Sequence, residues 1–334
     1  MKIVKNFCMW SDLLGYGAPL KKSKWQLNTK DAKENLLRIT LLEPHFHVRN
    51  NSEEVSLVLN DGIIRSLDFK GELDYYERKY LSWLSRAILN YNILNESDIK
   101  NNFYGLRSVL SIGDRFSYMN ERVSMASNTI AHSSVIETLK KKTAIYSPKE
   151  FQMNMAFSKA YIMESSGSRA GLNGNNLFID IDVLNFIKDY YEDNGHKWNR
   201  MKTIDHDDGI SSTIVSDWVS VSYKINEKMT EKNFVWSVDM FMEGKQYTLM
   251  TLWFDKEKIE YNDNDIQTEL YILEKYSPED EDENFVIEMK TTPNKKKKEL
   301  TETEIEEMLK HLEESYKERQ RVLSNFKNYK EEES

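Results

Sequence analysis

Apolar runs of strand length alternate with stretches of helical periodicity in the first half of the chain. The apolar run Ile3–Trp10 predicts a buried strand, with the strand expected to begin at Lys2. Helical spacing of apolar residues follows over Lys24–Leu42. Two further apolar runs meet at Asn60-Asp61-Gly62, a sequence that predicts a hairpin over Glu54–Phe69.

The alternation continues beyond this hairpin. Apolar residues at three- and four-residue spacing predict a long helix over Leu73–Asn92, and Leu106–Ile112 is typical of a strand. Helices are then expected over Asn120–Thr143 and Pro148–Glu164, followed by a short strand over Leu177–Ile181. This order is typical of the ferredoxin-like plan, in which an antiparallel sheet carries helices on one face, so we predict an α+β fold.

From about Asp189 the pattern becomes rich in strands. Ile210–Ile225 and Glu269–Tyr276 are each predicted to be strands. Phe234–Met242 and Gln246–Phe254 are expected to form a hairpin around Glu243-Gly244-Lys245. This block is either a second, all-β unit or an extension of the first sheet.

The last forty residues combine a charged stretch with an amphipathic helix. Lys295–Lys298 are four consecutive lysines, and Thr301–Lys330 carries an apolar stripe behind a capping-box sequence. We expect this helix to dock on the β-rich part or on a second subunit, because several large apolar side chains would otherwise face water. Its length of about 45 Å at the helical rise favours the second subunit. The sequence thus predicts three parts: a first domain over 1–188, a β-rich region over 189–290, and a linker with C-terminal helix over 291–334.

Composition narrows the class of protein. The 334-residue chain is 40% hydrophobic and 30% charged, a profile typical of a globular protein. Its net charge of −9 argues against nonspecific binding to nucleic acid or to anionic membranes, so we expect neither partner. The single Cys8 excludes a disulfide framework and lies in an apolar strand, where a buried inert thiol is expected. No apolar run approaches the length of a membrane helix and no signal peptide is recognisable, so a cytoplasmic protein is expected.

Two aspartates stand out because of where the predicted strands end. Asp12 precedes the glycine turn Leu13-Leu14-Gly15 after the first strand, and Asp61 lies in the hairpin turn. Two carboxylates brought side by side need a counter-charge, which a divalent metal commonly supplies. We predict that Asp12 and Asp61 approach to within the ~7 Å that one metal ion can bridge. The alternative is that Asp12 caps the next helix and Asp61 is only a turn residue.

Five segments, taken in order, resemble the class III nucleotidyl cyclases. Trp10-Ser11-Asp12-Leu13-Leu14-Gly15-Tyr16 is similar to the Phe-x-Asp-x-x-Gly-Phe of that family, and Asn60-Asp61 to its Gly-Asp turn. The segment from Arg107 to Gly113 fills the slot of the strand Arg-x-Gly-x-x-x-Gly, and Phe157–Ser165 the slot of a helix ending in Glu-Ser. Leu177–Ile181 supplies the last strand, so the resemblance covers residues 1–188.

The resemblance implies a site and an activity. Asp12 and Asp61 would be the metal ligands for Mg²⁺ or Mn²⁺, with Asp114 a weaker candidate. Arg107 and Ser158 would contact a nucleoside triphosphate, and the ribose 3′-oxygen would attack the α-phosphate with loss of pyrophosphate. The family's sites form between two subunits, so a homodimer is implied. In type, the chain also resembles the divergent bacterial phage-defence cyclases that make cyclic pyrimidine nucleotides.

The helix departs from the family pattern at two positions. Ser158 stands where the family has Asn, and Ile162 stands where it has the Arg that stabilises charge on the phosphates. Lys159, three residues earlier on a neighbouring part of the helix, is the candidate replacement cation, although as a point charge rather than a fork.

Three functions therefore stay open. The first is a metal-dependent nucleotidyl cyclase, and the second is an inactive descendant used as a binding or assembly module. The third, which is remote, is a metal nuclease or phosphohydrolase that uses the acidic residues around Asp205.

Overall fold

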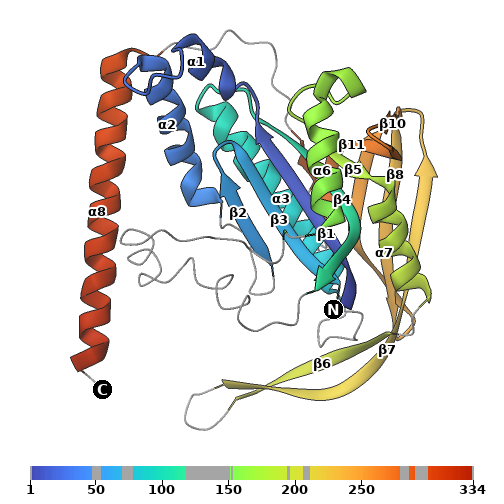
Figure 1. Ribbon diagram of the computed structural model, residues 1–334. Helices are drawn as coiled ribbons and strands as arrows, with labels where there is room; N and C mark the ends of the chain where they lie inside the picture. Colours follow the sequence, from blue (N-terminus) through green and yellow to red (C-terminus); the bar gives the residue numbers. More distant parts are fainter. Residues whose placement is uncertain are drawn as a thin grey trace.

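The computed structural model is a mixed α/β structure with one large sheet (Figure 1). The residues that it describes are 2–46, 54–69, 78–117, 151, 153–193, 196–205, 211–278, 286–289 and 300–332. The helix expected over Asn120–Thr143 lies outside these residues.

The N-terminal part of the sheet is built around β1. The strand order in this part is β2 (Val55–Leu59), β3 (Gly62–Phe69), β1 (Lys2–Leu13), β4 (Leu106–Ser117) and β5 (Leu177–Asp180). β1 pairs antiparallel with β3 on one side and with β4 on the other, whereas β4 and β5 are parallel. The expectation of a purely antiparallel sheet is therefore wrong at β5, because the chain returns to this edge through a helix rather than a hairpin.

The sheet continues through β11 into the strand-rich second half. The first part of β11 (Ile266–Pro278) pairs with β5 and β10 (Ile259–Asp263), and its last part pairs with β9 and β12 (Ile287–Glu288). A register shift between Leu273 and Lys275 separates the two parts. From β11 the order runs on through β9 (Lys245–Asp255), β8 (Asn233–Met242), β7 (Ser211–Met229) and β6 (His196–Asp205).

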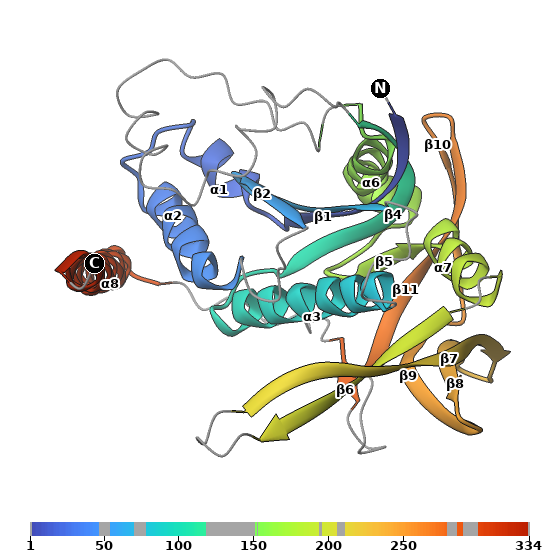
Figure 2. The same ribbon diagram turned by 90° about the horizontal axis from the view of Figure 1, so that it is seen from below.

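Helices cover both faces of the sheet, so the expectation of helices on one face is wrong. α3 (Lys79–Lys100) packs on the face that carries Phe7, Met9 and Leu13 of β1. α6 (Met155–Ser166) packs on the other face, against Cys8 and Trp10 (Figure 2). Alternate residues of one strand point to opposite faces, and because β1 is apolar at four successive positions, Phe7–Trp10, both faces can bury a helix.

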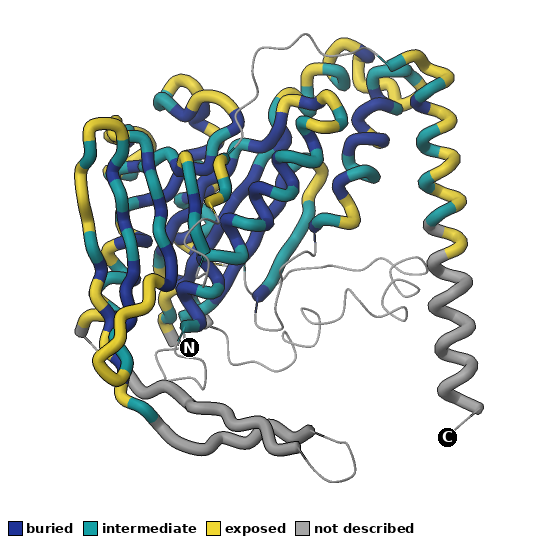
Figure 3. Tube along the Cα trace, turned by 180° about the vertical axis from the view of Figure 1, so that it is seen from behind, coloured by how far each residue is buried: buried dark blue, intermediate teal, exposed yellow. Residues whose placement is uncertain are grey.

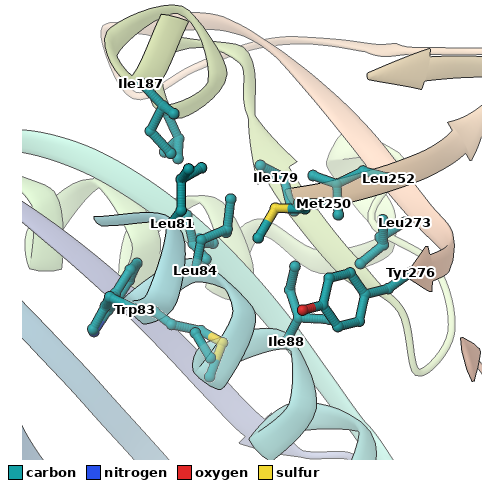
Figure 4. Close-up of a cluster of buried hydrophobic side chains, with 14 of the residues drawn as sticks. Leu81, Trp83, Leu84, Ile88, Ile179, Ile187, Met250, Leu252, Leu273 and Tyr276 are labelled. Atoms are coloured by element: carbon teal, nitrogen blue, oxygen red, sulfur yellow. The ribbon is translucent and has the colours of Figure 1, made fainter. Parts of the chain in front are cut away.

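One apolar core joins the two halves of the sheet. Figure 4 shows Leu84 of α3, Ile179 of β5 and Leu252 of β9 in a single cluster with Tyr276 of β11. α7 (Ile181–Asp193), a helix that the sequence analysis missed, contributes Ile187 to the same core. Figure 3 shows the buried residues following the central strands and α3. Cys8 is fully buried, and burial raises the pKa of its thiol, as expected for an inert cysteine.

The helix expected over Lys24–Leu42 is shorter and is preceded by a separate turn of helix. α1 (Gly17–Lys22) ends before an irregular loop, and α2 (Lys30–Leu42) begins after Thr29, whose hydroxyl accepts a hydrogen bond from the Ala32 amide. Such N-caps favour Thr and fix where a helix starts. The hairpin β2–β3 lies as predicted.

α8 (Glu302–Glu332) occupies the stretch expected to be the C-terminal helix. It packs on α2, not on the β-rich part, so that alternative is wrong. Ile305 is fully buried there, and the Lys33 amine of α2 forms ion pairs with Glu302 and Glu306. This end of α8 packs on α2 because an apolar side chain is buried at one turn and complementary charges lie beside it.

Candidate functional site at the end of strand β1

The aspartates Asp12 and Asp61 lie at adjacent strand ends. β1 extends to Leu13 rather than ending at Trp10, so Asp12 is itself a strand residue, opposite Gly62 of β3 and Arg107 of β4. The Leu13 amide donates a hydrogen bond of 3.0 Å to the Asp61 carbonyl, which joins the hairpin turn to the end of β1. Both aspartates are half-buried.

The Asp12 carboxyl has an unusual charge environment. Burial, together with the charges of Glu164 and Asp61, raises its pKa from 3.8 to about 7, while Arg107 and Arg38 act in the opposite direction. Burial and the charge of Asp61 also raise the pKa of Tyr16 in the following loop. Asp61 is thus close enough to Asp12 and Tyr16 for its charge to act on both.

Neither carboxylate receives a hydrogen bond from the part of the chain that the structure describes. The buried acids elsewhere differ: Asp98 accepts from Arg38, Asp180 from Thr268 and Asp239 from Asn226. Among the described residues, no group of three or more His, Cys, Asp and Glu side chains could hold a metal ion. Two protein carboxylates nevertheless suit Mg²⁺, which is commonly bound by one or two carboxylates with phosphate and water oxygens.

Arg107 is held beside Asp12 by Glu164 of α6. Its guanidinium forms an ion pair of 2.6 Å with the buried Glu164 carboxylate and donates to the Leu172 carbonyl at 3.1 Å. The second oxygen of Glu164 accepts from the Trp10 indole at 3.3 Å. The sequence analysis predicted Arg107 as a nucleotide contact but gave no role to Glu164, which it treated only as part of the Glu-Ser motif.

Glycines make room around these charged groups. A Cβ atom on Gly62 would lie 2.2 Å from the Trp10 ring, so only glycine lets that ring cross β3 next to Asp61. A Cβ on Gly167, which has φ +55°, would lie 3.3 Å from the Arg107 guanidinium. The glycine-rich loop before β5 therefore packs against Arg107.

Ser158 and Lys159 lie elsewhere in this chain. The Ser158 hydroxyl donates to the Asn154 carbonyl of its own helix, and the Lys159 amine forms ion pairs with Asp180 at 2.6 Å and Asp182 at 2.7 Å. The register of β4 with β5 places Asp180 level with Ser111, four residues or ~13 Å along the sheet from Arg107. The structure thus brings Asp12, Asp61 and Arg107 together but leaves Ser158 and Lys159 apart from them.

Asp114 is at the opposite end of the sheet. It pairs with Lys5, whereas Arg107 pairs with Asp12, so seven residues separate the two levels on both strands, about 23 Å. Its carboxylate forms an exposed ion pair of 2.7 Å with Lys5. The interpretation of Asp114 as a weaker metal candidate at the Asp12 site is therefore wrong.

Arg38 is the other cation whose charge acts on Asp12, and the sequence analysis missed it. It lies on α2 and is almost fully buried. The signal that could have indicated it is an arginine on the core-facing side of an amphipathic helix. A buried arginine needs several hydrogen-bond acceptors, which other parts of the chain must supply.

Known proteins give few points of comparison. No protein-family model matches the chain, and no curated protein matches it. Among solved structures, the guanylyl cyclase Cya2 is similar over 64% of this chain and 89% of its own, with 14% identity and a TM-score of 0.33. A bacterial light-regulated adenylyl cyclase is similar over 64% of this chain and 91% of its own, with 12% identity and a TM-score of 0.32. TM-scores this low do not decide the fold or the function of the chain.

In the part of the chain that the structure describes, no helix is long and apolar enough to cross a membrane.

Proposed function

We propose that this protein binds a nucleoside triphosphate together with Mg²⁺ or Mn²⁺ at Asp12 and Asp61, and acts as a nucleotidyl cyclase. The observation that carries the proposal is the pair of half-buried carboxylates at adjacent strand ends, which receive no hydrogen bond from the described residues. The strand order β2-β3-β1-β4 supports a ferredoxin-like arrangement of the first domain. We also propose that the chain divides into three parts: the first domain over 1–188, the β-rich region over 189–290, and the linker with the C-terminal helix over 291–334.

The donor set fits a hard divalent cation. Asp12 and Asp61 offer oxygen ligands only. Burial, together with repulsion from Glu164 and Asp61, raises the pKa of Asp12 to about 7, and a cation would relieve that repulsion. Such an ion supplies Lewis-acid polarisation of a phosphoryl oxygen and neutralises charge on the phosphates. Because a carboxylate must be deprotonated to bind a metal, the affinity for the ion should fall as the pH drops below about 7.

The chain's own residues would orient the nucleotide. Arg107 is fixed by Glu164 and Leu172, so its positive charge is already held beside Asp12 and could act on a phosphate there without a change of rotamer. Lys159 would have to leave Asp182, its exposed partner, to meet a phosphate. Ser158 and Lys159 lie apart from Asp12 in one chain, so their proposed roles require a homodimer in which the α6 of one chain faces the acids of the other.

The outer face of α6 is a candidate surface for that homodimer. Met155 is 48% exposed and Tyr161 is 47% exposed, and both lie on the helix that covers the Asp12 face of the sheet. We expect Tyr161→Glu to convert a dimer to a monomer, as measured by light scattering. Tyr247→Glu, at a tyrosine that is also exposed but lies on β9 in the strand-rich second half, should leave the mass unchanged.

The test of the activity is direct. The full chain would be incubated with each of the four ribonucleoside triphosphates and Mn²⁺, and the products would be analysed by mass spectrometry. Asp61→Asn should abolish the cyclic product while leaving the fold intact, since Asn keeps the shape but removes the charge that binds the metal. Asp114→Asn is the matched control, because it removes an aspartate about 23 Å away. Full turnover of the Asp61→Asn variant would contradict the proposal.

The second candidate function is an inactive module with the same fold. The observation in its favour is that the one lysine near the expected arginine position is neutralised by Asp180 and Asp182. Binding of Mn²⁺ and nucleotide without product would support it over the cyclase.

A further inference from the structure

Two buried side chains of α2 hold the loop that follows Asp12. The Asn35 amide donates to the Tyr16 carbonyl at 2.7 Å, and the Arg38 Nη1 donates to the Leu14 carbonyl at 3.0 Å. Asn35 and Arg38 are three residues apart, so they lie on one face of the helix. Both side chains are at least 95% buried. The loop itself turns at Gly15, which has φ +75°.

Arg38 also fixes the loop that precedes Arg107. Its Nε and Nη2 donate to the two oxygens of Asp98 at 2.8 and 2.6 Å, and Nη2 donates to the Gly105 carbonyl at 3.2 Å. Asp98 in turn accepts from the Gly105 amide at 2.8 Å. The guanidinium carbon lies 5.1 Å from the centre of the Phe103 ring. One guanidinium thus binds the chain on both sides of the site.

The two loops are also bonded to each other. The Leu14 amide donates to the Gly105 carbonyl at 3.1 Å, the same oxygen that Arg38 contacts. Leu14 lies two residues after Asp12, and Gly105 two residues before Arg107. A shift of Arg38 would therefore move the strand ends that carry the acid and the cation together.

We infer that Asn35 and Arg38 are positioning residues for the metal and phosphate ligands at the ends of β1 and β4. This inference rests on the proposed function for its consequence, but the positioning itself can be measured separately. Groups that orient the ligands of a metal commonly change its affinity 10- to 100-fold when they are removed. A purely stabilising role would instead lower the free energy of unfolding and leave the affinity of the folded protein unchanged.

The experiment compares this cluster with a similar one far from the site. Asn35→Leu removes the donor to Tyr16 with a side chain of the same branched shape and number of heavy atoms, and leaves the Arg38–Asp98 pair in place. Arg38→Lys keeps the charge but loses the fork, and Asn35→Ser replaces Asn35→Leu if that variant does not fold. The control is Arg115→Lys, because Arg115 forms an equally bidentate pair with Asp68 at the other end of β1.

Two readouts on the full-length protein separate the outcomes. Amide hydrogen exchange at Leu14 and Tyr16 should become at least ~10-fold faster in Asn35→Leu and in Arg38→Lys, and Mn²⁺ affinity by electron paramagnetic resonance should fall at least ~10-fold. Arg115→Lys should change neither. Unchanged exchange in the α2 variants, or equal acceleration in Arg115→Lys, would overturn the inference. A wild-type protein that binds no Mn²⁺ would overturn the proposed function, while the exchange data would still decide the positioning.

Discussion

The two ends of β1 differ in how their charged side chains are balanced, although the same three strands, β3, β1 and β4, form both ends. At the Lys5–Asn6 end, Arg115 forms a bidentate pair with Asp68, and the Asn6 amide donates to Asp68 and to Ser66. At the Asp12 end, the charges of Glu164 and Asp61 act on Asp12, which has no hydrogen-bond donor among the described residues. At the Lys5–Asn6 end, which we call the closed end, the charged side chains neutralise one another. The Asp12 end, which we call the open end, carries an excess of negative charge that a cation could offset.

α6 links the two ends. Asn154, at its N-cap, accepts from the Phe157 amide and donates to Asn6 at 2.9 Å, and Glu164, near its last turn, binds Arg107. A Cβ on Gly113 would lie 2.6 Å from the Ala156 backbone, so glycine allows the helix to lie this close to β4. We infer from this comparison that the closed end supplies stability and fixes α6, while the open end would supply the chemistry of the proposed function. Substitutions at three positions test this division.

The largest expected effect is at the closed end. Arg115→Met leaves the Asp68 carboxylate without its guanidinium, and breaking such a pair should cost about 3 kcal/mol of unfolding free energy. Urea unfolding would measure the loss. Mn²⁺ affinity of the folded variant should match that of the wild type, and a weakened affinity would show that the two ends are not independent.

At the open end we expect a smaller change in the free energy of unfolding, and this change should stabilise the protein. The pKa of Asp12 is raised to about 7 in the folded protein, so the folded state binds more protons than the unfolded state between pH 4 and 7, and stability falls as the pH rises through that range. Asp12→Asn should remove this penalty. With allowance for solvent screening of a half-exposed group, the metal-free variant should be about 1–2 kcal/mol more stable at pH 8.

The same comparison at about pH 2.5 is the control for Asp12→Asn. This pH lies below the ordinary carboxyl pKa of 3.8, so both states of the wild type are largely protonated at this position and the two proteins should unfold at the same urea concentration. A variant that is less stable at pH 8 would mean that the Asp12 carboxylate has a stabilising partner.

The smallest change in the free energy of unfolding is expected at α6, the helix that links the two ends of β1. Asn154→Ala removes the N-cap of α6 and the bond to Asn6, at a cost of about 1 kcal/mol. Asn154→Asp keeps the acceptor for the Phe157 amide but loses the donor to Asn6, so it separates the two contributions. If α6 also positions Arg107 through Glu164, Asn154→Ala should weaken nucleotide binding, and equilibrium dialysis would show this.

The sequence predicted the elements near the site better than the packing around it. The hairpin and its Asp61 turn followed from Asn-Asp-Gly between apolar runs, which is a local signal. The side of the sheet on which α6 packs was not predictable, because β1 is apolar on both faces. The strand β6 and the helix α7 were missed, and α7 begins directly after β5 with no turn residue between them.

Which charged side chains meet around the site depends on pairing between residues far apart in the sequence, so these contacts could not be predicted from the sequence. Glu164 meets Arg107 across 57 residues, and Arg38 meets Asp98 across 60. The ion pairs of Lys159 likewise depend on β5 and could not be foreseen from helical spacing. A single sequence specifies which residues are charged, but the register of β1 with β3 and β4 decides which of them meet.

The position of β11 has a consequence for synthesis of the chain on the ribosome. β5 pairs with β4 on one side, and its other edge is covered by Leu270–Ile272 of β11, some 90 residues later, as Asp180 pairs with Leu270. At a translation rate of 5–20 residues per second, that edge would stay open for roughly 5–20 s after β5 has emerged. An unpaired apolar strand edge is a template for pairing with other chains. The nascent first half should therefore depend on chaperones, and its truncation before β11 should aggregate rather than fold.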